Sequence, residues 1–312
     1  MDSDAAGFEV KRLGAALSNW GRWGAADQRG TVNFITPETR RAAASLVRSG
    51  DVLDLGMEFG VNGPQSGSAR FNPIHSMRML PSDRVLSDAG LVVADDVVTM
   101  PLQCATQWDG LAHVGYDGLL YNNVPASEVT ASDGAPRNSI EHVVPHLIGR
   151  GVLLDVAGYR GVECLSATDE VTSDDLEATA AAQGVSLSSG DVVLVRTGWY
   201  QRYLAGDHAA FVGWTQPGLG MSTATWLHDH EVAAICVDNF AVECLPAKEP
   251  GTMLPLHMVL IRDLGMTLGE MFNLEELAVA CRREGRWAFL FSGIGLKFTA
   301  AVGTPVSPVV VM

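Results

Sequence analysis

The sequence predicts an α/β fold, in which strands alternate with helices along the chain. Apolar β-rich runs alternate with capped helical segments, 47% of the residues are hydrophobic, and no linker or low-complexity tract divides the chain. With 312 residues, there is enough core-forming material for one large domain. We therefore expect a single domain over residues 1–312, with residues 1–36 as an N-terminal arm.

The first half of the chain contains one clear helix signal and one long irregular segment. A helix is expected over 37–48, with Thr36 as its N-cap, Pro37 at the first helical position and Gly50 beyond its end. Residues 62–84 are rich in Gly, Pro and Ser without a clear period, so we expect a long loop, and long loops in compact domains are often functional.

The second half alternates regularly between the two kinds of element. A helix follows Ser173 and is closed by Gly184, and another runs from 222 to about 230. The last helix is expected from Asn273, which forms a capping-box pattern with Glu276, to about Gly285. Strands are expected at VLLDV (152–156), DVVLVRTGW (191–199), VAAICVD (232–238) and PVVVM (308–312).

Composition and charge exclude several classes of partner. The formal net charge of −15 would repel nucleic acid and anionic membrane surfaces. No apolar stretch is long enough for a membrane span, and the opening MDSDAAGFEVKRLG does not have the form of a signal peptide. The five cysteines are odd in number and form no CxxC pair, so we expect reduced thiols in a cytoplasmic protein.

The common cofactor and nucleophile motifs are missing from the sequence. It contains no complete GxGxxG, no GxxxxGK[ST], no GxSxG and no HExxH. Dinucleotide binding, a phosphate-binding loop and a serine-nucleophile elbow therefore lack support.

One short stretch concentrates polar side chains between apolar neighbours. In QCATQWDGLAH, the residues Gln103, Gln107, Asp109 and His113 are separated by even intervals. On an extended strand, even intervals place all four side chains on one face. The ordinary alternative is a strand whose polar face meets water, but such a face usually carries Lys, Glu and Thr. We therefore favour a functional site.

Two further candidates lie far downstream, in PLHMVLIRDLGMTLGEMFNLEEL. His257 precedes an apolar run, and Glu270 stands between Gly269 and Met271. Burial of a bare carboxylate is costly, so Glu270 must be paired, bound to a metal or exposed to solvent. Alternatively, His257 is an ordinary core histidine whose hydrogen bonds are made within the protein, and Glu270 is a charged residue near a helix N-terminus.

These segments resemble the putative cyclase family of metal-dependent hydrolases, which includes bacterial kynurenine formamidase and isatin hydrolase. The family motif HxGTHxDxPxH aligns with residues 103–113, of which Thr106, Asp109 and His113 are kept. The opening NWGRWGAADQRGTVNFITPE resembles a longer-chained branch of this family. The resemblance implies a swivelling β/β/α domain with a mixed sheet and flanking helices, assembled as a homodimer or homotetramer.

The resemblance also implies a metal site, with one departure. The positions of Gln103 and Gln107 are histidine ligands in the family, whereas those of Asp109, His257 and Glu270 serve a metal. Amide oxygens are neutral, hard and weak ligands, so the site would favour Mn²⁺ over tight Zn²⁺ binding. We expect Asp109, His257 and Glu270 as ligands, with Gln107 or water completing the shell. Alternatively, the amides bind substrate and the metal is lost.

The predicted function is hydrolysis of an amide, imide, lactam or ester bond in a small, often cyclic molecule by metal-activated water. His113 is the expected general acid and base, because an imidazole titrates near neutrality and four extended residues would separate it from Asp109 by about 13 Å. The alternatives are a lyase or cyclase that acts through an enolate, and a metal-free small-molecule-binding protein. The side chains expected to bind the substrate are Gln103, Trp20, Trp23, Phe34 and Trp108.

Overall fold

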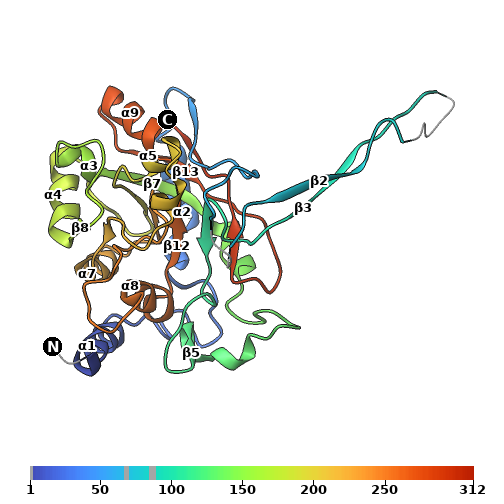
Figure 1. The fold of residues 1–312 in the computed structure, drawn as a ribbon. Helices are drawn as coiled ribbons and strands as arrows, with labels where there is room; N and C mark the ends of the chain where they lie inside the picture. The colour runs from blue at the N-terminus through green and yellow to red at the C-terminus, as the bar shows by residue number, and fades with distance from the viewer. Residues whose placement is uncertain (1–2, 67–69, 84–88) are drawn as a thin grey trace.

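The centre of the fold is a mixed sheet of nine strands in the order β1-β15-β13-β7-β9-β11-β12-β4-β14 (Figure 1). The structure is a computed structural model that describes residues 3–66, 70–83 and 89–312. Neighbours among β7, β9, β11 and β12 run parallel, and the outer pairings are antiparallel. The strands are β1 Val52–Asp54, β4 Gln107–Asp109, β7 Ile148–Asp155, β9 Val192–Arg196, β11 Ala234–Val237, β12 Thr267–Glu270, β13 Ala288–Ser292, β14 Gly303–Pro305 and β15 Val309–Val311.

The four expected strands form as β7, β9, β11 and β15. The central parallel strands are buried on both faces, which is why the sequence shows continuous apolar runs there instead of alternation. Alternate side chains of β9 pack in two separate hydrophobic cores. Val193 and Val195 belong to the first core, and Val192 and Leu194 belong to the second. The α/β prediction with a mixed sheet and flanking helices is confirmed.

Helices cover both faces of the sheet. Buried residues of α4 Ser173–Gln183 and α7 Ser222–Asp229 belong to the first core, and those of α9 Glu275–Glu284 to the second. Helix α4 forms where it was expected, because Thr172 and Asp175 make a capping box and Gly184 ends the helix at φ 64°. The short helices are α3 Val156–Tyr159, α5 Tyr200–Leu204, α6 His208–Phe211 and α8 Pro255–His257.

Two helix boundaries differ from the prediction. Helix α2 spans Pro37–Ala44 and stops short of residue 48, because the backbone amides of Arg48, Ser49 and Gly50 all donate to the carbonyl of Met312. Helix α9 begins at Glu275, and the amide of Glu275 donates to Oδ1 of Asn273 at 3.3 Å, so Asn273 and Glu276 do not form the expected capping box.

The N-terminal segment lies against the chain that leads into β12. It contains α1 Ser3–Ala16 and the 3₁₀ turn Gly30–Phe34, which are followed by α2. The π-helical segment Met258–Leu264 packs on α1, and the indole nitrogen of Trp20 donates to the carbonyl of Arg262 at 2.6 Å. The N-terminal segment thus packs against the residues between His257 and β12 and supports their position.

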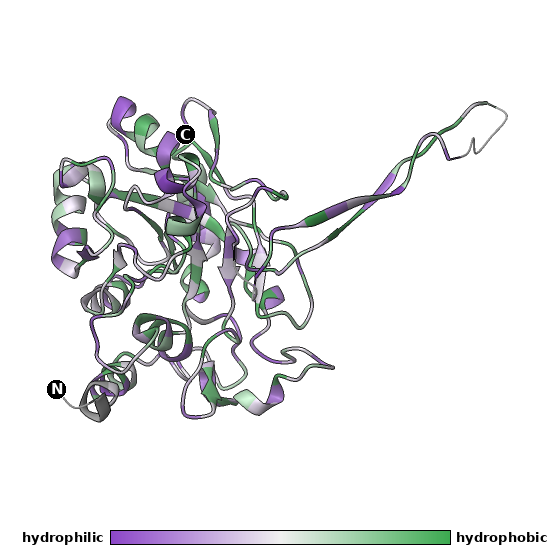
Figure 2. Ribbon diagram, viewed as in Figure 1, coloured by the Kyte–Doolittle hydropathy of each residue, from purple (hydrophilic) through white to green (hydrophobic). Residues whose placement is uncertain are grey.

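Residues 62–84 are not a single loop, in contrast to the prediction. Strand β2 (Ile74–Met79) pairs with β3 (Asp95–Thr99) in a two-stranded ribbon that projects from the body (Figure 1). Residue 84 lies outside the described residues. The ribbon was missed because both of its faces are exposed, so no core-facing alternation marks it. Figure 2 shows apolar segments along this ribbon.

Smaller elements complete the chain. Two short pairs, β8 Glu170–Val171 with β10 Gly218–Leu219 and β5 Leu119–Leu120 with β6 Val124–Pro125, lie outside the main sheet. Short 3₁₀ turns occupy Tyr121–Asn123, Ala126–Glu128, Ile140–His142 and Val144–His146. Within the described residues, no helix is both long and apolar enough to cross a bilayer.

Candidate metal centre

Strand β4 places two polar side chains on the same face of the sheet. It pairs antiparallel with β12, with Gln107 opposite Glu270. Trp108, between Gln107 and Asp109, faces the other way and packs edge-on against Phe272, with ring centroids 5.5 Å apart. The expected alternation therefore holds for Gln107 and Asp109, which face the site, while Trp108 belongs to the core.

The strand does not extend over the whole of the polar stretch. Only Gln107–Asp109 is extended, and Gln103 and His113 lie in turns on either side. The backbone amide of His113 donates to the carbonyl of Gly110 at 3.0 Å, which reverses the chain. As a result, Nε2 of His113 lies 3.7 Å from Oδ1 of Asp109, far closer than the separation expected for an extended chain.

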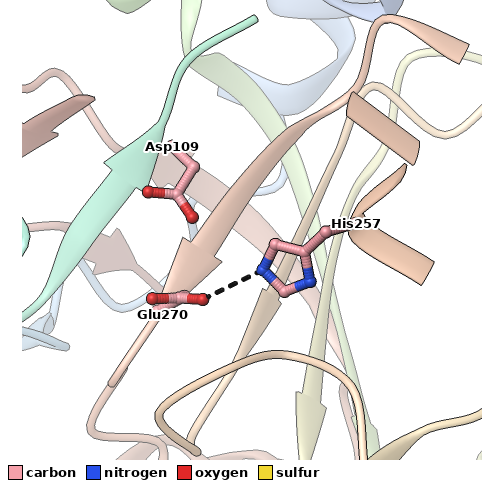
Figure 3. Close-up of side chains that lie close together, drawn as sticks. All are labelled: Asp109, His257 and Glu270. Atoms are coloured by element: carbon pink, nitrogen blue, oxygen red, sulfur yellow. Dashed lines mark hydrogen bonds and ion pairs between the residues drawn. The ribbon is translucent and has the colours of Figure 1, made fainter. Parts of the chain in front are cut away.

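Three buried side chains converge beside β4 and β12. Asp109, His257 and Glu270 each offer a ligand atom within 4.8 Å of the other two. Figure 3 shows His257 pointing to Glu270, with Asp109 above the carboxylate from the neighbouring strand. Nε2 of His257 lies 3.3 Å from Oε1 of Glu270. The structure thus brings Asp109 together with His257 and Glu270, which follow it by more than a hundred positions in the sequence.

Glu243 fixes the orientation of His257. Its Oε1 lies 2.5 Å from Nδ1 of His257 and also accepts the backbone amide of His257 at 3.0 Å. A proton held between Nδ1 and Glu243 directs the Nε2 edge of the ring towards the site. Burial acts to lower the pKa of His257, but hydrogen bonds to Glu243 and Glu270 outweigh it and raise that pKa to about 10.

The two carboxylates of the site repel one another. Burial and the neighbouring charge of Asp109 together raise the pKa of Glu270 to about 7. Nε2 of Gln107 donates to Oε2 of Glu270 at 2.6 Å and lies 3.4 Å from Oδ1 of Asp109. One amide group therefore bridges both acids.

Two buried oxygen atoms of the site lack hydrogen-bond partners among the residues that the structure describes, and a metal ion would supply the missing interaction. Oδ2 of Asp109 and Oε1 of Gln107 are buried and have no hydrogen-bond partner in the described part of the chain. Buried oxygen acceptors without donors are costly, and a cation satisfies them. Two carboxylates, an amide oxygen and one imidazole nitrogen form a donor set that suits divalent ions. The residues therefore fit a divalent metal ion.

A cavity of about 460 Å³ opens onto this cluster. Its polar lining includes His113, His257 and Glu270, and its apolar lining includes Trp214 and Phe240. This volume is in the range of pockets that bind small molecules. The remaining lining residues are Gln65, Ser66, Arg70, Val212, Ala241, Leu245 and Leu254.

The aromatic residues expected to contact substrate lie elsewhere. Trp108 is fully buried in the core, and its indole nitrogen donates to the carbonyl of Gly293. Trp23 and Phe34 pack on each other with centroids 5.1 Å apart, and Trp20 lies against Arg262. None of the four is among the described residues that line the cavity: Trp108 lies in the core, and the other three belong to the N-terminal segment.

Gln103 also lies outside the cavity lining. A side chain at Gly303 of β14 would come within 2.5 Å of its Nε2, so the amide packs closely over that strand. The expected substrate contact for Gln103 is therefore not seen in this cavity.

Two residues at the site were not found from the sequence. Glu243 stands between Val242 and Cys244, and this is the same signal, an acid with apolar neighbours, that singled out Glu270. Arg70 follows the Gly- and Ser-rich stretch and carries no comparable signal.

Comparison with known proteins agrees with this architecture. The family model for the putative cyclases matches residues 28–244. A solved structure described as a novel cyclase is 36% identical, covering 95% of this chain and 100% of its own, with a TM-score of 0.87. No curated protein sequence matches the chain significantly.

More distant solved structures share the fold. An isatin hydrolase bound to the product analogue thioisatinate is 18% identical, covers 86% of this chain and 94% of its own, and has a TM-score of 0.62. Isatin hydrolase A from Ralstonia solanacearum is 20% identical, with coverage of 86% and 93% and a TM-score of 0.61. The family model and the 36% identical structure together show that the chain belongs to the putative cyclase family.

Proposed function

We propose that this protein is a metal-dependent hydrolase that cleaves an amide, imide, lactam or ester bond of a small, often cyclic molecule. The observation that carries the proposal is the cluster of Asp109, His257 and Glu270, of which His257 and Glu270 line a cavity, together with the unsatisfied buried oxygens of Asp109 and Gln107. Isatin hydrolase and metal-dependent hydrolases among the proteins of similar fold support the same reaction class.

In this proposal, some residues of the site bind the metal ion and another transfers protons. Asp109, His257 and Glu270 would hold the ion, with the oxygen of Gln107 available as a further ligand. The bound ion would polarise a carbonyl and activate a water molecule. Two carboxylates and one imidazole suit Mn²⁺ as well as Zn²⁺, and the oxygen-rich set favours Mn²⁺.

His113 has the position of a general acid and base in this proposal. It lines the cavity beside Asp109, and 23% of its side chain is exposed, so it can exchange protons with substrate and with solvent. Glu243 acts through His257, which it orients. The apolar wall formed by Phe240, Leu245 and Leu254 would limit the access of bulk water to the reacting bond.

Elemental analysis of the purified protein, followed by a screen of cyclic amides, formamides and lactones, tests the proposal. Stoichiometric metal, activity lost on chelation and restored by Mn²⁺ or Zn²⁺, and one atom of ¹⁸O from labelled water in the product are expected. Product without ¹⁸O would indicate a lyase or cyclase that acts through an enolate. Failure to bind any divalent ion would indicate a metal-free small-molecule-binding protein.

The proposal includes the setting in which the enzyme works. A cytoplasmic location is supported by the five cysteines, which are all unpaired in the structure. We also propose a homodimer or homotetramer, which the exposed ribbon of β2 and β3 supports. No nucleic-acid or membrane partner is proposed, because the net charge is −15.

A further inference from the structure

Arg70 is the only lysine or arginine among the residues that line the cavity. Its guanidinium lies over the ring of Phe240, 5.5 Å from the centroid. Several other arginines that are at least partly buried in this acidic protein have carboxylate partners, such as Arg150 with Asp191 and Arg196 with Asp155. In the described part of the chain, no carboxylate lies within ion-pair distance of Arg70.

Two described residues near Arg70, Gln65 and Asn72, are hydrogen-bonded to each other and to the body of the protein. Asn72 makes two hydrogen bonds to the backbone of Gln65, accepting its amide at 2.8 Å and donating to its carbonyl at 3.1 Å. The side chain of Gln65 in turn donates to the carbonyl of Cys104 at 2.8 Å, beside the start of the polar stretch. Gln65 and Arg70 both line the cavity, so these contacts fix its wall two residues after and five residues before Arg70.

The charge of Arg70 acts on Glu270 of the metal cluster, although the two residues form no ion pair in the described part of the chain. It is one of the charges that act to lower the pKa of Glu270, although burial and Asp109 dominate and raise that pKa. Glu270 already contacts Gln107 and His257. When an ion compensates the acids of the cluster, Arg70 retains an uncompensated positive charge that faces the cavity.

We propose that Arg70 binds a carboxylate of the substrate, so that this enzyme acts on anionic molecules. The inference rests on the proposed hydrolase function and specifies its substrate class. The carboxylate would lie at Arg70, an apolar or aromatic body would pack on Phe240 and Trp214, and the scissile bond would lie at the metal cluster. A guanidinium suits this role because it presents paired N–H donors to a carboxylate.

Ligand binding, which does not require turnover, tests this inference. Benzoate and benzamide have nearly the same shape and differ in charge, and their affinities can be measured by calorimetry on Mn²⁺-loaded and on chelator-treated protein. The wild type should bind benzoate roughly tenfold to a hundredfold more tightly than benzamide in both states, as expected for hydrogen bonds to a charged group. Arg70→Gln should abolish this preference, and Arg70→Lys should keep part of it.

Arg78→Gln is the matched control, because it removes the same charge from the exposed ribbon outside the cavity lining. It should leave the preference for benzoate unchanged. Equal affinities in the wild type, or a preference that survives Arg70→Gln, would overturn the inference. A preference that requires Mn²⁺ and ignores Arg70 would mean that the ion holds the carboxylate, which refutes this inference and leaves the hydrolase proposal standing. If the protein shows an Arg70-dependent preference for benzoate but binds no Mn²⁺, the result would support the inference about Arg70 and refute the hydrolase proposal.

Discussion

Nε2 of Gln107 lies 2.6 Å from Oε2 of Glu270, directly across the pairing of β4 with β12. The same nitrogen is 3.4 Å from Oδ1 of Asp109, so one neutral amide bridges two acids. An NH₂ group cannot bind a cation, whereas the amide oxygen can. In this arrangement Gln107 reduces the repulsion between the acids, and its unsatisfied oxygen remains available as a ligand.

Asp109→Asn should remove most of the bound metal. The substitution keeps the shape of the side chain but removes its charge and adds an NH₂ group where an unsatisfied oxygen now lies. Elemental analysis after dialysis measures the loss. Asp238→Asn is the control, since Asp238 is also fully buried but accepts hydrogen bonds from Thr197 and Gly198 away from the cluster. Full metal content in Asp109→Asn would show that Asp109 is not a ligand.

Gln107→His should raise zinc affinity by at least about tenfold, or about 1.4 kcal/mol. An imidazole nitrogen is a stronger zinc ligand than an amide oxygen, and position 107 faces Glu270 directly. Titration calorimetry with Zn²⁺ measures the change. Gln107→Leu, which removes the amide and supplies no ligand, should not tighten zinc binding. If the histidine variant behaves like the leucine variant, residue 107 does not approach the ion.

His113→Ala should reduce turnover by about 10²–10⁴ while metal content and Tm stay nearly unchanged. The 3.7 Å between Nε2 of His113 and Oδ1 of Asp109 is longer than a hydrogen bond, and the side chain is partly exposed, so its loss should cost little stability. His142→Ala, which alters a histidine outside the cavity lining, is the control. Loss of metal together with activity would make His113 a ligand. If neither changes, residues 103–113 are not the catalytic centre.

Metal binding should strengthen as the pH rises from about 6 to 9. In the metal-free protein the pKa of Glu270 is raised to about 7 and that of His257 to about 10, so protons must leave before an ion binds. Folded His257 holds its proton more tightly than the unfolded chain, and the stability this contributes is lost as the pH rises towards 10. The raised pKa of Glu270 likewise destabilises the metal-free fold as the pH rises towards 7. The gain in Tm on adding Mn²⁺ should therefore grow with pH.

Glu243→Gln provides the test of this pH dependence. The substitution removes the charged partner of Nδ1 and should lower the pKa of His257, so the gain in Tm should depend less steeply on pH. A gain that is independent of pH in the wild type, or the same slope in Glu243→Gln, would contradict the assignment of these protons.

The ribbon of β2 and β3 should be covered by another copy of the chain in solution. Two-stranded ribbons are marginally stable alone, and Ile74, Met77, Val97 and Val98 are exposed on this one. Light scattering should give a mass of two or four times 33.2 kDa. Joint substitution of Met77 and Val98 by Glu should yield monomers, whereas Val279→Glu on the exposed face of α9 should not. A monomeric wild type would rule out this assembly.

Local sequence signals were sufficient for elements that depend on neighbouring residues. The helix Ser173–Gln183 is predicted by the segment that follows Ser173 and by Gly184 at its end, and the buried strands are predicted by uninterrupted apolar runs. The same local alternation correctly placed Gln107 and Asp109 on one face and so made them candidates for a common site. The resemblance to the putative cyclases added His257 and Glu270, which local patterns alone left with ordinary explanations.

Only the tertiary structure decided which of these groups meet. The turn between Gly110 and His113 returns the imidazole to Asp109, and no periodicity in the sequence encodes that reversal. Glu243, in the segment after β11, is hydrogen-bonded to His257 at the end of α8, and no repeat or spacing in the sequence indicates this contact. Arg70 lines the cavity between Gln65, which is bonded to the carbonyl of Cys104, and Asn72, which is bonded to Gln65. Such contacts depend on how distant elements pack, and sequence patterns report only on neighbours along one strand or helix.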